Sequence, residues 1–480
     1  MQQFLDWDQI VYANNTYSAL VPGRMPLLNP HHLHVETGSM VFHQFMSEYF
    51  GDAGFTDVMF NNRMKSLLFA SIGIICAFLL LYRITGSILL SLAGTLLIGV
   101  SHGYLHYATK FDTPIYPAAI FIVTVFILEI YRHAVKKPVV WLLVIPTAFL
   151  LFAGVMAHQY MGLVCVLLCI AIALPPWLFN LPWKPAPFLL HRKKGVVPVL
   201  ETSAPTRWAA AVSIAVLGIV FIVAGYFWAG KTMQNLPFHE DDPSVGRGVF
   251  RDSMFYQWLF LYETTSDLWG DGLEEFAPEA PLRGYTDAWV AQPGNVDRFN
   301  RNYSFAYNFR DFDSDTAVIH NIVGLITLIT LFGCVIYFPI LWGMYGRTFF
   351  LVFASFISFS LFTTYWEPYY FEFWLIPQIS QVFLFIMLID AVFTKLKKGI
   401  SVNLKPLAAG IVLFFAFSLC AHNQYYYLLP YSRTKQLEGY SRDWDEGYYM
   451  PLYSDEVYRN PDNVYGSIYN TEPGSVFSRE

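Results

Sequence analysis

Charged residues are scarce in this chain of 480 residues, of which only 14% are Asp, Glu, Lys or Arg. Soluble domains carry about 25%, so the deficit argues against an ordinary soluble protein. Hydrophobic residues make up 55%, and the mean hydropathy is +0.40. Apolar runs of about 17–24 residues recur, and each can cross the hydrocarbon core of a bilayer as a helix. The sequence therefore predicts an all-α polytopic membrane protein.

Cysteine is also rare, and its positions exclude a disulfide framework or a CxxC metal site. The five cysteines all fall in apolar runs, at positions 76, 165, 169, 334 and 420. We expect them to be buried thiols. The start of the chain lacks the basic segment and the apolar core of a signal peptide.

Ten apolar segments are predicted to be membrane helices. They are residues 66–82, 87–107, 114–132, 139–157, 160–180, 208–229, 317–340, 347–366, 370–393 and 406–422. Basic residues gather in alternate loops, which the positive-inside rule places in the cytoplasm. The remaining loops hold nearly all of the acidic residues and are predicted to lie on the non-cytoplasmic side.

This topology divides the chain into five parts. They are an outer N-terminal loop (1–65), six membrane helices (66–229), an outer loop (230–316), four membrane helices (317–422) and an outer C-terminal tail (423–480). An outer amino terminus is hard to translocate without a signal. We therefore expect a first membrane helix to precede Met1, which would give 10–11 helices in all.

The outer loop 230–316 carries seven basic and fifteen acidic residues. Within it, Arg251–Trp269 is rich in apolar and aromatic residues with charged ends, a pattern typical of a helix on the bilayer surface. The tail begins with an aromatic group, Tyr425–Tyr427, that fits the membrane interface. The outer loop and the tail are the surfaces where we expect membrane protein partners. We expect no nucleic acid partner.

Ionisable residues cluster at the outer helix ends. Acids there can act as a general base, and cations can hold a phosphate group. The candidate acids are Asp6, Asp8 and Asp112. The candidate substrate-binding or phosphate-binding residues are Lys110, His31, His32, His158, Arg247, Arg251, Glu367 and Glu372.

The order of these segments resembles the GT-C membrane glycosyltransferases, which use polyprenyl-phosphate sugars and include protein mannosyltransferases and aminoarabinose transferases. An outer loop with an acid precedes Asn62–Met64, which opens a span. The small-residue run Ser91–Tyr107 then precedes Ala108–Asp112, and Tyr365–Pro377 resembles the family's tyrosine-rich late segment.

The resemblance implies a GT-C-like bundle with a large outer loop. By position, it assigns the first-loop acid to Asp8, or less favourably to Asp6, and the second-loop acid to Asp112. Lys110 stands where the family usually has arginine. An acid would deprotonate an acceptor hydroxyl, which then displaces the lipid phosphate from the sugar on the outer face.

Simpler roles remain open for several of these residues. Asp8 and Asp112 can cap helices, since Asp is common at helix starts. The histidines 31, 32 and 34 form a loose HHxH pattern that suits hydrogen bonding better than metal ligation. His102 and His106 share one helix face, which suits either metal binding or a helix–helix contact. We assign no metal ligand, and a divalent cation is the one cofactor left open.

Two other classes of function compete with the enzyme. The chain can be a catalytically inactive GT-C-fold subunit of a larger membrane assembly, which its long outer loop and tail would suit. A transporter is disfavoured, because its ionisable groups would lie at the bilayer midplane or its halves would be related. No motif in the sequence identifies the donor sugar or the acceptor.

Overall fold

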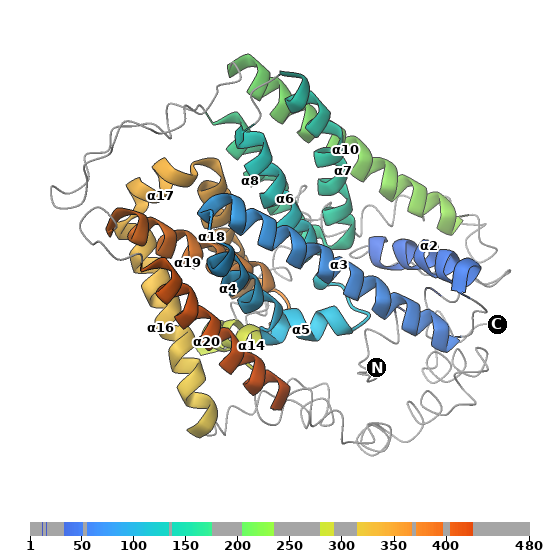
Figure 1. The fold of residues 1–480 in the computed structure, drawn as a ribbon. Coiled ribbons are helices and arrows are strands. Elements are labelled where there is room, and N and C mark those ends of the chain that lie inside the picture. The colour runs from blue at the N-terminus through green and yellow to red at the C-terminus, as the bar shows by residue number, and fades with distance from the viewer. Residues whose placement is uncertain are drawn as a thin grey trace.

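The described part of the chain is helical and contains no strand (Figure 1). The computed structural model describes residues 12, 16, 33–50, 55–133, 137–174, 204–234, 279–291, 314–366, 371–396 and 404–425. The helices of its first half are α2 (Leu33–Phe50), α3 (Phe55–Thr85), α4 (Ile88–Gly99), α5 (His102–Thr109), α6 (Ile115–His133), α7 (Lys137–Ala157), η1 (Gln159–Met161) and α8 (Gly162–Ala173). Those of its second half are α10 (Ala204–Gln234), α14 (Glu279–Trp289), α16 (Ser314–Ile336), α17 (Phe338–Tyr345), α18 (Arg347–Trp366), α19 (Leu375–Leu396) and α20 (Lys405–Asn423).

Six described helices are long and apolar enough to cross a membrane, namely α3, α7, α10, α18, α19 and α20. Two bent pairs, α4 with α5 and α16 with α17, raise the number to eight if each pair is one span. Shorter apolar helices lie within α6 and from Gln159 to Ala173. This is the architecture of a polytopic helical membrane protein, and each of the ten predicted segments contains a helix.

Two predicted segments are bent rather than straight. The axes of α4 and α5 differ by 65°, and those of α16 and α17 by 81°. Between α4 and α5, Ser101 adopts an extended conformation and its hydroxyl donates to the carbonyl oxygen of Ile98 at 2.7 Å. Such a bond competes with the helical pattern. At α17, Pro339 occupies the first turn, where its missing N–H is tolerated.

The turn from α3 to α4 follows from its local sequence. Gly86 has a φ of +65°, which glycine adopts without a steric penalty, and its N–H donates to the carbonyl oxygen of Tyr82 at 2.8 Å. Ser87 then caps α4 by accepting a hydrogen bond from the N–H of Leu90 at 3.3 Å. A glycine stop followed by a serine start makes the chain reverse within two residues.

Helix α19 lies at the centre of the bundle. It contacts α3, α4, α6, α14, α16, α17, α18 and α20. Its apolar window is 83% buried, whereas those of α3 and α10 are 28% buried. The outer helices carry large exposed apolar residues at helical spacing, for example Val212, Val216 and Val220 on α10. These stripes form the surface that faces lipid.

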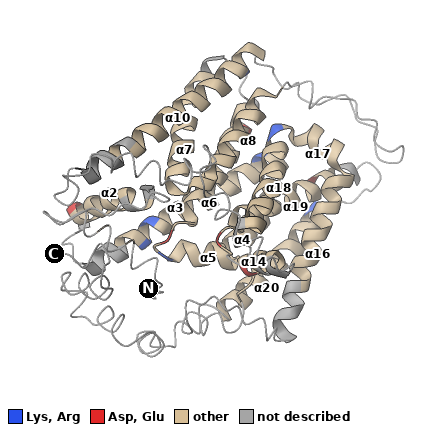
Figure 2. Cartoon of the chain, turned by 180° about the vertical axis from the view of Figure 1, so that it is seen from behind, with Lys and Arg blue, Asp and Glu red and all other residues tan. Residues whose placement is uncertain are grey.

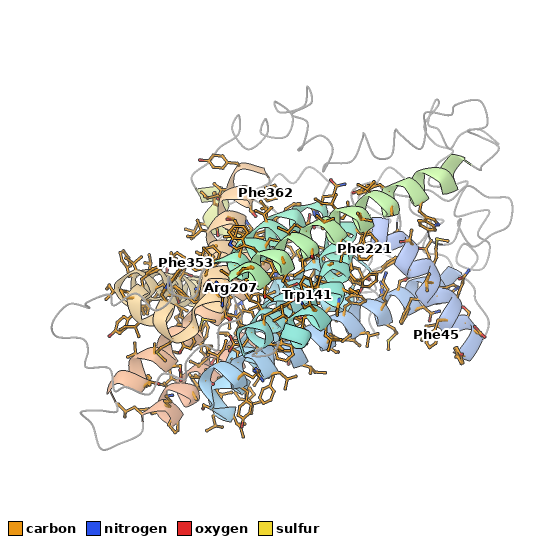
Figure 3. All side chains as sticks on the ribbon, turned by 90° about the horizontal axis from the view of Figure 1, so that it is seen from above. Phe45, Trp141, Arg207, Phe221, Phe353 and Phe362 are labelled. Atoms are coloured by element: carbon orange, nitrogen blue, oxygen red, sulfur yellow. The ribbon has the colours of Figure 1, made fainter. Side chains whose placement is uncertain are left out.

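Charged residues are sparse along the helices (Figure 2). Apolar and aromatic side chains cover the ribbon instead, with Trp141 on α7 and Phe221 on α10 among those labelled in Figure 3. This distribution is the one that the low charge content of the sequence predicted.

The two ends of the bundle differ in the residues they carry. One end, here named the site end, holds Lys110, His158, Glu372 and Asn423, at the carboxyl ends of α5, α7 and α20 and just before α19. The other, here named the basic end, holds a second set of residues at helix termini. That set comprises Arg83, Arg207, Arg347 and Lys405.

The segment 1–65, predicted as an outer loop, contains helical structure that the sequence interpretation missed. Its described residues include α2 and the first turns of α3. Helix α2 packs against α3 and α7. It lies at the periphery of the bundle in Figures 1 and 3. The predicted surface helix at 251–269 lies outside the described residues.

Candidate functional site

Helix α5 brings three polar rings to the site end. His102, His106 and Tyr107 all pack around Phe371, with ring centroids at 5.0, 5.2 and 5.3 Å from its ring. His102 and His106 are themselves 5.5 Å apart. The bend before α5 turns this short helix away from the axis of α4 and so presents these rings to the segment that precedes α19.

Glu372 lies in the turn Phe371–Trp374 that leads into α19. Its carboxylate Oε2 accepts a hydrogen bond from the Tyr107 hydroxyl at 3.3 Å. Its negative charge also acts on the Tyr160 hydroxyl. The turn is held in place because the hydroxyl of Thr363 donates to the carbonyl oxygen of Phe373 at 3.1 Å. A half-buried acid therefore lies between α5 and η1.

His158 lies on the other side of the same turn. It caps η1, where its Nδ1 accepts a hydrogen bond from the N–H of Tyr160 at 3.4 Å. Its ring packs against Tyr160 at 3.9 Å and against Phe373 at 5.6 Å. The structure therefore brings two of the predicted site residues, His158 and Glu372, to one turn.

Lys110 and Asp112 follow α5 directly and are both buried, with exposed fractions of 3% and 4%. Asp112 Oδ1 accepts a hydrogen bond from the N–H of Thr113 at 2.6 Å, two residues before α6 begins. The positive charge of Lys110 acts on His102 and His106. Lys110 is thus electrostatically coupled to the two histidines of α5.

Two cations that were not among the predicted site residues lie near the start of the apolar span of α3, which begins at Asn61. Arg63 and Lys65 are both buried. The Lys65 ammonium lies 4.5 Å from the centre of the Tyr116 ring and 5.8 Å from that of Phe111. Such a cation–π arrangement is favourable when the charge is shielded from water. The signal available in the sequence was a polar group, Asn61–Ser66, at the head of an apolar run.

The first segment of the chain reaches this cluster through one described residue. Tyr12 is buried, and its ring lies 5.9 Å from that of Phe111. Phe111 stands between Lys110 and Asp112 in the sequence. Segments about a hundred residues apart therefore meet beside the two charged residues of the loop after α5.

Helix α14, from the predicted outer loop, closes another side of the site end. His102 Nδ1 donates to the carbonyl oxygen of Asp287 at 2.8 Å. His422 Nε2 donates to that of Ala291 at 2.9 Å. Burial raises the pKa of the Tyr285 phenol above its usual value. The bonded His102 favours the helix–helix interpretation of the histidine pair.

Seven predicted site residues lie outside the described part of the chain. They are Asp6, Asp8, His31, His32, Arg247, Arg251 and Glu367. Among the described residues, no group of three or more His, Cys, Asp or Glu side chains is placed to hold a metal ion. The described residues do offer two features. One is the buried cation Lys110, two residues before the carboxylate of Asp112, and the other is the acid Glu372 beside Tyr107.

No protein-family model matches the sequence, and no curated protein sequence is similar to it. Any functional conclusion therefore depends on the chemistry of the residues at the site end.

Proposed function

We propose that the chain transfers a sugar from a polyprenyl-phosphate donor to an acceptor hydroxyl at the non-cytoplasmic surface of the membrane. In this proposal the helices form a GT-C-like bundle of ten or eleven spans with a large outer loop. The lipid chain of the donor stays in the bilayer, and its head group reaches the site end. The membrane scaffold then serves to bring a lipid-borne substrate to residues at the bilayer surface.

The observation that carries the proposal is the contact between Tyr12 and Phe111. It brings the first polar segment to the loop that holds Lys110 and Asp112. Asp8 precedes Tyr12 by only four residues, which span at most about 14 Å even when fully extended. A GT-C-type mechanism requires these two outer segments to meet at one site, and the contact supports that requirement.

The charges suit two different parts of such a substrate. Lys110 is a cation that can hold the phosphate oxygens, and the Lys65 ammonium lies 5.8 Å from the ring of Phe111, the residue next to Lys110 in the sequence. Glu372 is an anion, which would repel a phosphate but accepts hydrogen bonds from sugar hydroxyls. The neighbouring Tyr107 hydroxyl, which donates to Glu372, can accept a hydrogen bond from the same sugar. We therefore assign Glu372 to the sugar rather than to the phosphate.

The reaction would proceed by displacement at the anomeric carbon. The carboxylate of Asp8 or Asp112 takes the proton of the acceptor hydroxyl, and the acceptor oxygen bonds to the anomeric carbon. The bond from that carbon to the phosphate oxygen breaks, and its electron pair leaves with the phosphate. The positive charge on the sugar in the transition state resembles that in glycoside hydrolysis, while Lys110 stabilises the leaving phosphate.

Transfer of a radiolabelled sugar by the full chain in proteoliposomes tests this function. We expect the variants Asp8→Asn and Asp112→Asn to lose activity by about 10²–10⁴-fold if the residue is the general base. Glu48→Gln, which changes an exposed acid of α2 in the same way, serves as the control and should keep full activity. Full activity in both Asp variants would refute the residue assignment.

A catalytically inactive structural subunit is the second candidate. The observation that favours it is the short bond from Thr113 N–H to Asp112 Oδ1, which gives this acid a local structural role. Purification in mild detergent separates the two candidates. Stoichiometric protein partners without binding of polyprenyl-phosphate sugar would support the subunit, whereas sugar transfer by the isolated chain would exclude it.

A further inference from the structure

Helix α2 has two distinct faces. Val35, Ser39 and His43, spaced four residues apart, are buried against the bundle. On the outer face, Val41 and Tyr49 are 67% and 64% exposed, and Phe45 between them is 51% exposed. These three outer residues, here named the α2 stripe, repeat every fourth position and so form one line along the helix.

Buried polar contacts fix the rotation of α2. The Lys65 ammonium donates to the carbonyl oxygen of Val35 at 3.1 Å and to the Ser39 hydroxyl at 2.6 Å. The Asn61 amide donates to His43 Nδ1 at 3.0 Å. A helix rotation that buried the α2 stripe would break these bonds and expose Lys65. The α2 stripe is therefore a permanent outward feature of the protein.

The position of α2 relates it to the bilayer. Its two packing partners, α3 and α7, are both helices long and apolar enough to span a membrane. The apolar span of α3 begins at Asn61, the residue that binds His43 of α2. Helix α2 thus lies where a span leaves the hydrocarbon. Figure 3 shows Phe45 at the outer edge of the molecule, pointing away from the other helices.

We propose that α2 lies in the membrane interface and inserts the α2 stripe at the boundary between lipid head groups and acyl chains. Exposed aromatic residues are favoured at this depth. The Phe45 and Tyr49 rings lie 4.8 Å apart and present one continuous apolar surface. The adjacent span α3 also carries large exposed apolar residues, among them Leu67, Leu68 and Ile72, so lipid is the occupant that the position of the α2 stripe fits.

The charge of α2 indicates how it binds lipid. The helix contains no Lys or Arg, and its sequence includes Glu36 and Glu48. Attraction to anionic lipids therefore does not drive the contact, which depends on burial of the α2 stripe. We expect the contact to be insensitive to salt and to the fraction of anionic lipid. The inference goes beyond sugar transfer and holds whether or not the chain is an enzyme.

Photo-crosslinking tests the occupant directly. The full chain carries benzoylphenylalanine at position 45, in vesicles of phosphatidylcholine and in vesicles with anionic lipid added. The same substitution at Phe414, an exposed residue within the α20 span, gives the reference yield of lipid adducts. Mass spectrometry identifies each adduct, and an unirradiated sample gives the background.

We expect lipid adducts at position 45 within about threefold of the yield at position 414, in both kinds of vesicle and at low and high salt. Attachment near the glycerol backbone would place the residue at the interface. A crosslinked dimer, an adduct to another protein, or no adduct while position 414 reacts would each overturn the proposal. The crosslinking experiment does not measure sugar transfer. A failure of the proposed function would therefore leave the crosslinking result intact.

Discussion

Asn423 joins three parts of the molecule through one fully buried amide. Its Oδ1 accepts from the N–H of Ala291 at 2.8 Å. Its Nδ2 donates to the carbonyl oxygens of Val100 at 2.8 Å and Trp289 at 3.1 Å. Three of the four hydrogen bonds that an amide side chain can make are therefore formed. The residue links the end of α20 to α14 and to the bend before α5.

Substitution of this amide should destabilise the protein. Asn423→Ala leaves the N–H of Ala291 and the carbonyl groups of Val100 and Trp289 without this partner, at a cost of about 1–3 kcal/mol for each buried group that stays unsatisfied. Thermal unfolding in detergent measures the change. The adjacent Gln424→Ala is the control, because that residue is exposed and bonds only weakly, at 3.6 Å, to the Cys420 sulfur. Equal loss in both variants would contradict the role of Asn423.

Gly73 marks a second close approach, where α3 meets α5 and α6. A Cβ atom placed there would lie 2.6 Å from the Tyr104 hydroxyl and 3.3 Å from the Ala119 backbone. Tyr104 is not free to move, since its hydroxyl donates to the carbonyl oxygen of Ala70 at 2.7 Å. The glycine is therefore required by packing and not by backbone conformation.

The variant Gly73→Ala should lower the unfolding free energy by about 1–3 kcal/mol, the usual cost of overpacking. Gly410→Ala on α20 is the matched control, because nothing lies within 4 Å of its added Cβ. There the better helix propensity of alanine predicts a gain of up to about 1 kcal/mol. Unfolding curves that shift in the same direction for both variants would show that the α3 contact is looser than described.

At the scale of elements, hydrophobic runs predicted where the helices lie but not how they bend. The run 87–107 has polar and small residues spread along much of its length, so the break at Val100–Ser101 is not singled out by its hydropathy. At the break, the Ser101 hydroxyl donates to the carbonyl oxygen of Ile98. A serine can form several such hydrogen bonds with nearby backbone groups, so the sequence does not show which one forms. Helix α2 escaped prediction because Val35–Val41 mixes polar and apolar residues. Its polar contacts are with Asn61 and Lys65, and they join residues 18 to 30 positions apart.

The basic end shows how elements are joined by charge. Asp390 of α19 accepts from the Lys405 ammonium at 2.6 Å and from the Tyr345 hydroxyl at 2.7 Å. One carboxylate thus ties α17, α19 and the start of α20 together. Such a buried acid is stable only while its partners remain in place.

Removal of the tyrosine hydroxyl tests this junction. Tyr345→Phe keeps the ring and deletes the hydrogen bond to a charged acceptor, which predicts a loss of about 1.5–3 kcal/mol. Tyr82→Phe makes the same change on a residue that is 43% exposed at the end of α3, and should be close to neutral. Chemical or thermal unfolding in detergent compares them. Indistinguishable stabilities of the two variants would count against the Asp390 junction.

At the scale of the whole molecule, sequence reasoning singled out ionisable residues at helix ends and missed contacts between residues far apart in the chain. Glu372 and His158 were singled out because acids and histidines are conspicuous beside apolar runs, and their role in binding substrate stays a prediction. Lys65 was missed because its partner Val35 lies 30 residues away. The bond from His102 to the backbone carbonyl oxygen of Asp287 was missed because it spans 185 residues. Only folding brings such pairs together.

Sidedness is the global property from which the proposed function follows, and it can be tested with two exposed positions at opposite ends of the bundle. Arg83 ends α3 at the basic end, and Gln424 follows α20 at the site end. The positive-inside rule predicts that Arg83 faces the cytoplasm and Gln424 the outside.

In right-side-out membranes, a membrane-impermeant maleimide should label Gln424→Cys at once and Arg83→Cys only after permeabilisation. The unmodified chain, whose five cysteines lie in helices, supplies the background. The opposite labelling pattern would invert the topology and move the site end into the cytoplasm, where an outer-face sugar transferase cannot act.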